Sequence, residues 1–128
     1  MSGAKAVPTP RGDAAARAVR SAAWRFVLQR ASAAVLAICV AVHLTTIIHA
    51  VRHGVSAEAI IARMHASALW PAFYTIFVIA IAIHAPIGLR AIADEWMGLR
   101  GRIADAILVL IAGVLLAGGL YAVHTLAA

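Results

Sequence analysis

The chain has 128 residues, of which 64% are hydrophobic and only 12% are charged, and its formal net charge is +6. Such a composition excludes an ordinary water-soluble domain and indicates a membrane protein. Because the basic residues lie beside apolar segments, we interpret them as topology signals and expect no nucleic-acid partner, although a basic face could also dock an acidic soluble partner or anionic lipid headgroups.

Residues 1–26 form a basic N-terminal tail, which is rich in Ala, Pro and Gly from Met1 to Arg20. We expect this tail to become helical near the membrane, around Ala14 to Trp24. It is not a signal peptide, because the first apolar run begins far from the N-terminus, is too long, and is followed by two further runs.

The rest of the chain, residues 27–126, contains three apolar segments, Val27–Ala50, Trp70–Ala91 and Ile103–Leu126. Each is close to the roughly 20 residues that cross a hydrocarbon core about 30 Å thick. Ala, Leu and Ile follow one another without the alternation of barrel strands, which favours helices. The sequence therefore predicts an all-α fold, an integral membrane three-helix bundle.

The loop between the first two spans, His53 to Leu69, is long enough for a short helix. Ile60, Ile61 and Met64 would share one face of that helix. We expect it to lie on the outer surface of the membrane.

Basic residues are distributed unevenly around the spans. Nine precede the first span or lie between the second and third: Lys5, Arg11, Arg17, Arg20, Arg25, Arg30, Arg90, Arg100 and Arg102. The first loop has only Arg52 and Arg63. The positive-inside rule therefore predicts a cytoplasmic N-terminus, in a multi-pass protein of a bacterial-type inner membrane.

The remaining sequence carries packing signals and no catalytic motif. Gly113 and Ala117 have a small-xxx-small spacing and Gly118-Gly119 permits close backbone approach, so we expect the third span to close the bundle. Cys39 is the single cysteine, which excludes a disulfide within the chain. Nucleotide fingerprints, phosphate loops and zinc-protease motifs do not occur, so we do not expect the chain itself to be a catalyst.

His84 is the strongest candidate site residue. Counted from Trp70 it lies roughly 20 Å into the membrane, and an ionisable side chain at such a depth usually marks a site. Gly88, one turn further on the same face, would open a slot for a flat ring, and Pro86 loosens the helix nearby. His84 is thus either an axial haem ligand or a packing histidine that is hydrogen-bonded to protein.

His43 lies in the outer half of the first span. It could ligate a second haem at an outer level, or share one haem with His84, although we estimate that their depths differ by about 8 Å. Alternatively it is hydrogen-bonded to a neighbouring helix, with Thr46 as a possible local partner. His124 is close to the outer interface, where an imidazole reaches water and needs no other explanation.

Two motifs together resemble a known family. The pattern His84-x-x-x-Gly88-x-Arg90, followed by Glu95-Trp96, is similar to the second membrane helix of succinate dehydrogenase and fumarate reductase anchor subunits. Leu28 to Ala33 resembles the Arg-x-Ser/Thr-Gly/Ala motif that opens their first helix. The resemblance covers roughly Phe26 to Leu126 and extends to the three-span plan with the N-terminus inside.

The resemblance implies that His84 is the axial ligand of a haem b, with the second histidine supplied by a sister anchor. Arg90 would pair with a haem propionate, or else only mark the cytoplasmic boundary. Gly88 would belong to the same cofactor site.

The resemblance further implies that Arg30 and Ser32 line a quinone site at the cytoplasmic edge, although Arg30 could equally be a snorkelling topology residue. Family anchors have an Asp-Tyr pair where this chain has Glu95 and Trp96. The indole N–H of Trp96 can donate a hydrogen bond but cannot transfer a proton as a phenol does. Alternatively, Glu95 and Asp105 are simply solvated charges in a loop.

The function implied is that of a membrane anchor subunit, itself non-catalytic, which ligates haem b and helps to pass electrons between an iron–sulfur subunit and quinone. Its partners would be the flavoprotein and iron–sulfur subunits, a second anchor or a copy of itself, and the lipid membrane. The alternative is a cofactor-free structural subunit whose histidines are internal hydrogen-bond groups. A proton relay in a transporter is less consistent with three short spans without an internal repeat.

Overall fold

The computed structural model describes residues 10–98 and 101–128, and this part of the chain is helical without strands. It contains four helices, α1 (Pro10–Arg52), α2 (Ala57–Ala66), α3 (Leu69–Trp96) and α4 (Arg102–Ala127). Helices α1, α3 and α4 are long and apolar enough to cross a membrane. The predicted all-α membrane fold with three spans is confirmed.

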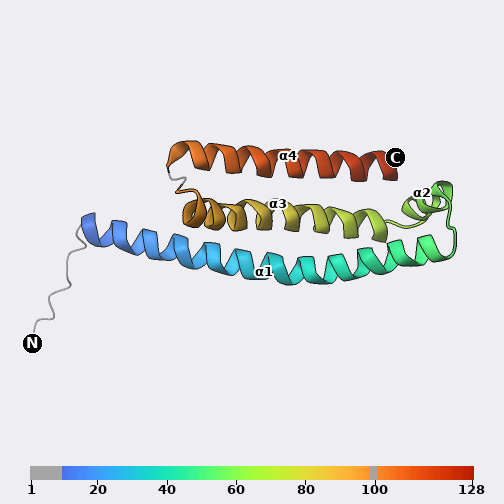
Figure 1. Cartoon of the computed structure of the whole chain (residues 1–128), viewed down its shortest axis with the longest axis horizontal. Helices are drawn as coiled ribbons and strands as arrows, with labels where there is room; N and C mark the ends of the chain where they lie inside the picture. Colours follow the sequence, from blue (N-terminus) through green and yellow to red (C-terminus); the bar gives the residue numbers. More distant parts are fainter. Residues whose placement is uncertain (1–9, 99–100) are drawn as a thin grey trace, which may run out of the picture.

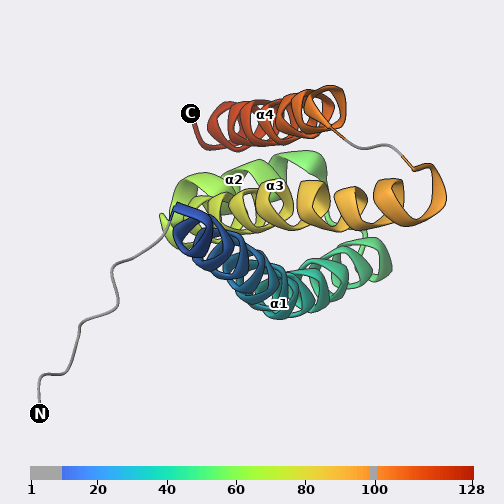
Figure 2. The same ribbon diagram turned by 90° about the vertical axis from the view of Figure 1, so that its left-hand side faces the viewer.

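The three long helices lie in a layer with α3 in the middle (Figures 1 and 2). Helix α3 packs against α1 on one side and α4 on the other, whereas α1 and α4 do not contact each other within the described residues. In the single chain α4 therefore packs on α3 and α2 and does not reach α1, and closure of the bundle around a cofactor stays a prediction. Because every span is apolar on all sides, hydropathy did not indicate which faces meet.

Only a few side chains are buried in this open layer. Among the described residues, those with less than 9% of their surface exposed are Ser32, Cys39, Met64, Ala80, Ala104 and Leu108. Most of the apolar surface is left for lipid or for partner chains.

Helix α1 runs through the predicted boundary between tail and membrane domain without a break, and it begins at Pro10. Proline suits this first position, because its missing N–H would have no partner inside the helix. The tail is thus helical well before Ala14, where we expected helix to begin, and residues 1–9 lie outside the described part.

Gly119 lies at a close contact between α3 and α4. A Cβ atom built there would lie 2.6 Å from Val78 Cγ1, whereas one at Gly113 or Gly118 meets nothing within 4 Å. The predicted close approach is confirmed at Gly119, but Gly113 is exposed and faces away from the rest of the chain.

The short helix expected between the first two spans is present as α2. The Ser56 hydroxyl accepts a hydrogen bond from the backbone N–H of Ala59 (3.3 Å) and caps the first turn. Met64 is buried, while Ile60 and Ile61 each remain 42% exposed. The helix rests on α3 and α4 at the end of the layer where α1 turns back.

Candidate functional site

His84 projects from α3 toward α1 and meets Ser32. The His84 Nδ1 and Ser32 Oγ atoms are 3.3 Å apart, and Ser32 Oγ also donates to the backbone carbonyl of Gln29 (3.1 Å). A hydroxyl has one proton, and with that proton on the Gln29 carbonyl, Ser32 accepts from the Nδ1–H of His84. Nδ1 of His84 then carries a proton and donates it to Ser32, so Nε2 is the ring nitrogen that points away from this bond.

The surroundings of this pair differ on its two sides. Ser32 is buried, with 7% of its surface exposed, and His84 is half-buried. Within the described residues the bond to Ser32 is the one hydrogen bond of the His84 ring. The packing histidine considered from the sequence would have such a partner, and so would a metal-binding histidine, whose second nitrogen is usually held in this way.

Gly88 lies one turn beyond His84, against Gln29 of α1. A Cβ built on Gly88 would lie 3.1 Å from Gln29 Nε2, so in this structure the Gln29 amide occupies the space expected to form a slot. Gln29 Oε1 is buried and accepts no hydrogen bond from the described residues. Gln29 carries no signal of its own in the sequence, although its position one turn before Ser32 places it on the same face of α1.

His43 meets α3 at a different level. Its Nδ1 is 3.3 Å from the Tyr74 hydroxyl, and its ring packs edge-on against Phe77 at 5.7 Å between centroids. The expected local partner, Thr46, instead donates its hydroxyl to the carbonyl of Val42 (2.7 Å). His43 therefore contacts a neighbouring helix, which agrees with the alternative of a hydrogen-bonded histidine, but its partner Tyr74 was not predicted.

The two histidines lie far apart along the contact between α1 and α3. The stretch of α1 from Ser32, beside His84, to His43 rises about 16 Å at ~1.5 Å per residue. This is twice the separation estimated from the sequence. Such a distance does not favour a single iron held by both rings.

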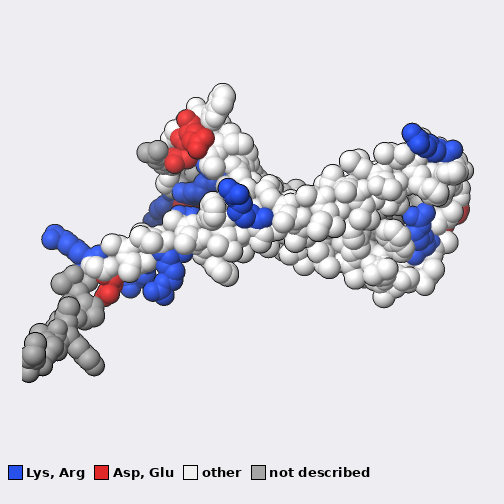
Figure 3. Space-filling model, turned by 90° about the horizontal axis from the view of Figure 1, so that it is seen from below, with Lys and Arg blue, Asp and Glu red and all other residues white. Residues whose placement is uncertain are grey.

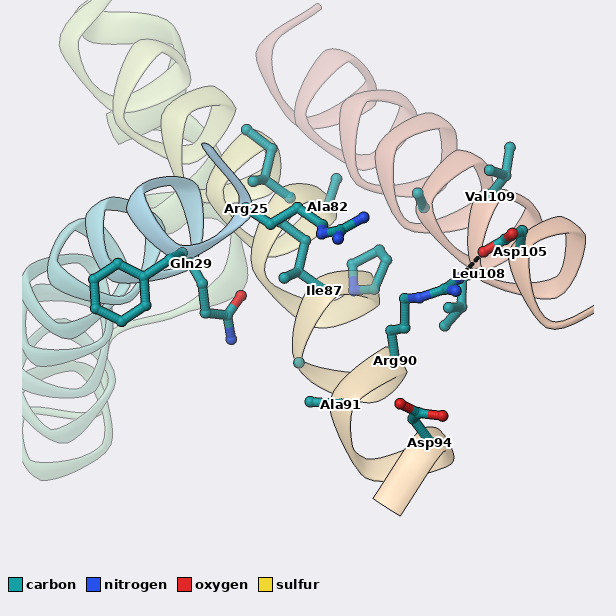
Figure 4. A pocket seen from close by; sticks show the side chains of 15 residues that line it. Arg25, Gln29, Ala82, Ile87, Arg90, Ala91, Asp94, Asp105, Leu108 and Val109 are labelled. Carbon is teal, nitrogen blue, oxygen red and sulfur yellow. Dashed lines mark ion pairs between the residues drawn. The ribbon is translucent and has the colours of Figure 1, made fainter. Parts of the chain in front are cut away.

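Arg90 forms an ion pair with Asp105 across the turn between α3 and α4. Asp105 lies in the first turn of α4 and pairs with Arg90, so it is not the loop charge that we expected, although its side chain remains 55% exposed to solvent. The pair borders an open groove of about 840 Å³, which Arg25, Gln29 and Asp94 also line. Figure 4 shows Arg25 reaching from α1 over α3, while Arg90 points to Asp105. His84 does not line this groove.

The four residues considered for a quinone site are not brought together in the chain. Ser32 is buried beside His84, and Arg30 is exposed with its guanidinium over the Phe26 ring, 5.0 Å from the centroid. Glu95 and Trp96 are exposed at the end of α3, and Trp96 has 84% of its surface free. A cluster of three or more metal-ligating side chains is not found in the described residues.

Comparison with known proteins gives one match. The model of a family described as succinate dehydrogenase/fumarate reductase transmembrane subunit matches residues 13–121. No curated protein and no solved structure matches significantly.

Proposed function

The chain belongs to the succinate dehydrogenase/fumarate reductase transmembrane subunit family, and we propose that in such a complex it holds a haem b through His84 and helps to pass electrons between the iron–sulfur subunit and a membrane quinone. As a member of this family with three long apolar helices, it is a multi-pass membrane subunit of that kind of complex. The haem, the quinone and the path of the electrons are the proposal.

The observation that carries the proposal is the hydrogen bond from His84 to Ser32. With the Ser32 proton on the Gln29 carbonyl, this bond directs a protonated Nδ1 toward α1 and would leave Nε2 of the half-buried ring as the electron-pair donor. Neutral imidazole nitrogen is an axial ligand of haem iron, and a bound haem supplies one-electron transfer. The role of Ser32 in this proposal is to orient His84, not to contact quinone as the family resemblance implied.

If a second residue holds the haem, it would come from another chain. His43 lies about 16 Å along α1 from Ser32, the residue beside His84, at ~1.5 Å per residue. Much of the apolar surface of the chain is also left uncovered and is available to a partner. A sister anchor, or a second copy of this chain, would cover the exposed side of His84 and complete the site. His43 is a weaker candidate for a second haem, because the Tyr74 hydroxyl beside it can donate to Nδ1 and so place the ring proton on Nε2.

For quinone, we propose a site that this chain shares with its partners at the N-terminal side of α1. Arg30 is exposed, and its N–H groups could donate to a quinone carbonyl held between this chain and a partner. Trp96 is also exposed but lies nearer the end of the layer, so it would contact a different part of that shared surface. Arg90 is already paired with Asp105, so its contribution to a haem propionate would be shared with that carboxylate.

The test is a reduced-minus-oxidised absorption spectrum of the purified complex with wild-type chain, His84→Gly or His124→Ala. We expect a b-type band in the wild type and in His124→Ala, where an exposed histidine is removed. The band should disappear in His84→Gly and return when free imidazole is added. A wild-type complex without this band would establish the cofactor-free structural subunit instead. A band that persists in His84→Gly without imidazole would show that the haem is not held by His84.

A further inference from the structure

Helix α1 is longer than a membrane requires. Its 43 residues extend about 64 Å at ~1.5 Å per residue, whereas a bilayer with its headgroups is about 40–45 Å thick. Roughly 20 Å of the helix therefore stands outside the bilayer when α1 crosses it steeply. The location of this excess is decided by the contacts with α3.

The excess lies at the N-terminal end. His43 lies beside Tyr74 and Ser32 beside His84, so the two helices run antiparallel in a fixed register. Continuing that register places the last residue of α3, Trp96, level with about residue 21 of α1 at equal rise per residue. Residues 10–20, which we call the N-terminal arm, project beyond α3 and α4 (Figure 1).

The arm is positively charged and exposed. It carries Arg11, Arg17 and Arg20 against a single acidic residue, Asp13, and residues 11–20 are all exposed. Figure 3 shows that basic side chains gather toward the end of the molecule where α1 projects, with a smaller number at the opposite end. Val19 adds an apolar side chain that is 71% exposed.

Lipid headgroups are out of reach for the outer part of this arm. Sharp kinks in helices arise at Pro, Gly or bulges, and α1 has neither Pro nor Gly from Asp13 to Arg52, so the arm cannot fold back onto the bilayer surface. Headgroups extend only about 5–8 Å beyond the hydrocarbon core on each side. Arg11 and Arg17 therefore stand in water above the membrane.

We propose that the N-terminal arm is a docking surface for an acidic face of the water-soluble part of the complex. This inference rests on the proposed function, because that function supplies the soluble iron–sulfur subunit as the neighbour. The guanidinium groups provide bidentate donors for carboxylates. Electrostatic contacts of this kind weaken with salt, which makes the docking measurable.

The experiment uses membranes that contain the complete complex, with wild-type chain or with Arg11→Glu/Arg17→Glu. This double variant leaves Arg20 and Arg25 in place to maintain topology. Arg52→Glu/Arg63→Glu, at the opposite end of the layer, makes the same charge change and is the control. The membranes are washed at increasing NaCl, and the soluble subunits that remain bound are quantified.

We expect the soluble subunits to dissociate from the arm variant at about tenfold lower salt than from the wild type or the control. Equal release from all three membranes overturns the proposal, and so does a difference that occurs only when the membranes contain phosphatidylglycerol, which would assign the arm to lipid. If the double variant does not accumulate, Arg11→Glu alone makes the same comparison. The b-type spectrum of the same membranes reports on His84 separately, so docking and haem binding can fail independently.

Discussion

Replacing Ser32 with alanine removes the acceptor that orients His84. The lost hydrogen bond is worth about 0.5–1.5 kcal/mol between neutral groups, and the backbone carbonyl of Gln29 keeps its place in the helix. A hydrogen bond from Nδ1–H makes the opposite nitrogen a stronger donor and so favours the oxidised, more positive iron. Without it we expect the midpoint potential of the haem to rise by about 20–60 mV, since ~59 mV corresponds to tenfold for one electron.

The assay is a potentiometric titration of the b-type absorption in the purified complex. Ser21→Ala is the matched control, because Ser21 Oγ also donates to a carbonyl of its own helix, that of Ala18 (2.9 Å), but it is exposed and contacts no histidine. Only Ser32→Ala should raise the potential. The KM for quinone should stay the same in both variants, because this geometry uses the Ser32 hydroxyl for His84.

Two outcomes would refute the reasoning. If Ser32→Ala and Ser21→Ala have the same midpoint potential, the Ser32 hydroxyl does not hold the ligand. If the potential is unchanged but the KM for quinone rises in Ser32→Ala alone, Ser32 contacts quinone as the family resemblance implies.

Two further predictions concern the fold. Gly119→Ala should lower the free energy of unfolding in detergent by about 1–3 kcal/mol relative to Gly113→Ala. The reason is that a Cβ at Gly119 would lie 2.6 Å from Val78 Cγ1, whereas a Cβ at Gly113 meets open space. Equal free energies of unfolding for the two variants would contradict the α3–α4 contact. In α2, hydrogen bonds from the backbone N–H of Glu58 and from the Ser56 hydroxyl lower the pKa of the Glu58 carboxyl. The ionised carboxylate therefore stabilises α2 above the ordinary carboxyl pKa, and this stabilisation is lost as the pH falls through the lowered pKa. The protection of α2 amides from hydrogen exchange should therefore be greater in the wild type than in Glu58→Gln near neutral pH, and this difference should vanish at acid pH. Identical protection in both chains at every pH would show that the carboxylate does not stabilise this helix.

Composition and hydropathy were sufficient for the fold class, because spanning a hydrocarbon core requires long apolar helices whatever surrounds them. They could not place the helices side by side. Helix association in lipid depends on close contacts such as that of Gly119 with Val78, and Gly113 offers the same signal in sequence yet faces open space. Helix was expected in the tail from about Ala14, and only its earlier start at Pro10 was not predicted, since an Ala-rich basic segment is compatible with either tail or helix.

In the candidate site, too, the sequence indicated single residues but not the contacts between helices. His84 was identifiable because an ionisable residue in a membrane span is rare and expensive. Its partner Ser32 was identified only through the family motif and for another role, because a hydrogen bond between α1 and α3 has no sequence signature. Asp105 was likewise read as a loop charge, and its pairing with Arg90 depends on how α3 and α4 meet.

The polar groups left along α1 indicate why this subunit needs a partner. Burying an unpaired acceptor such as Gln29 Oε1 costs about 1–3 kcal/mol, and the half-buried Nε2 of His84 also lacks a donor or metal among the described residues. A single layer of helices cannot cover both faces of α3 or satisfy these atoms with its own side chains. An assembly that brings a second chain and a haem to His84, and a soluble subunit to the N-terminal arm, would remove both deficits and give the uncovered apolar surface a partner.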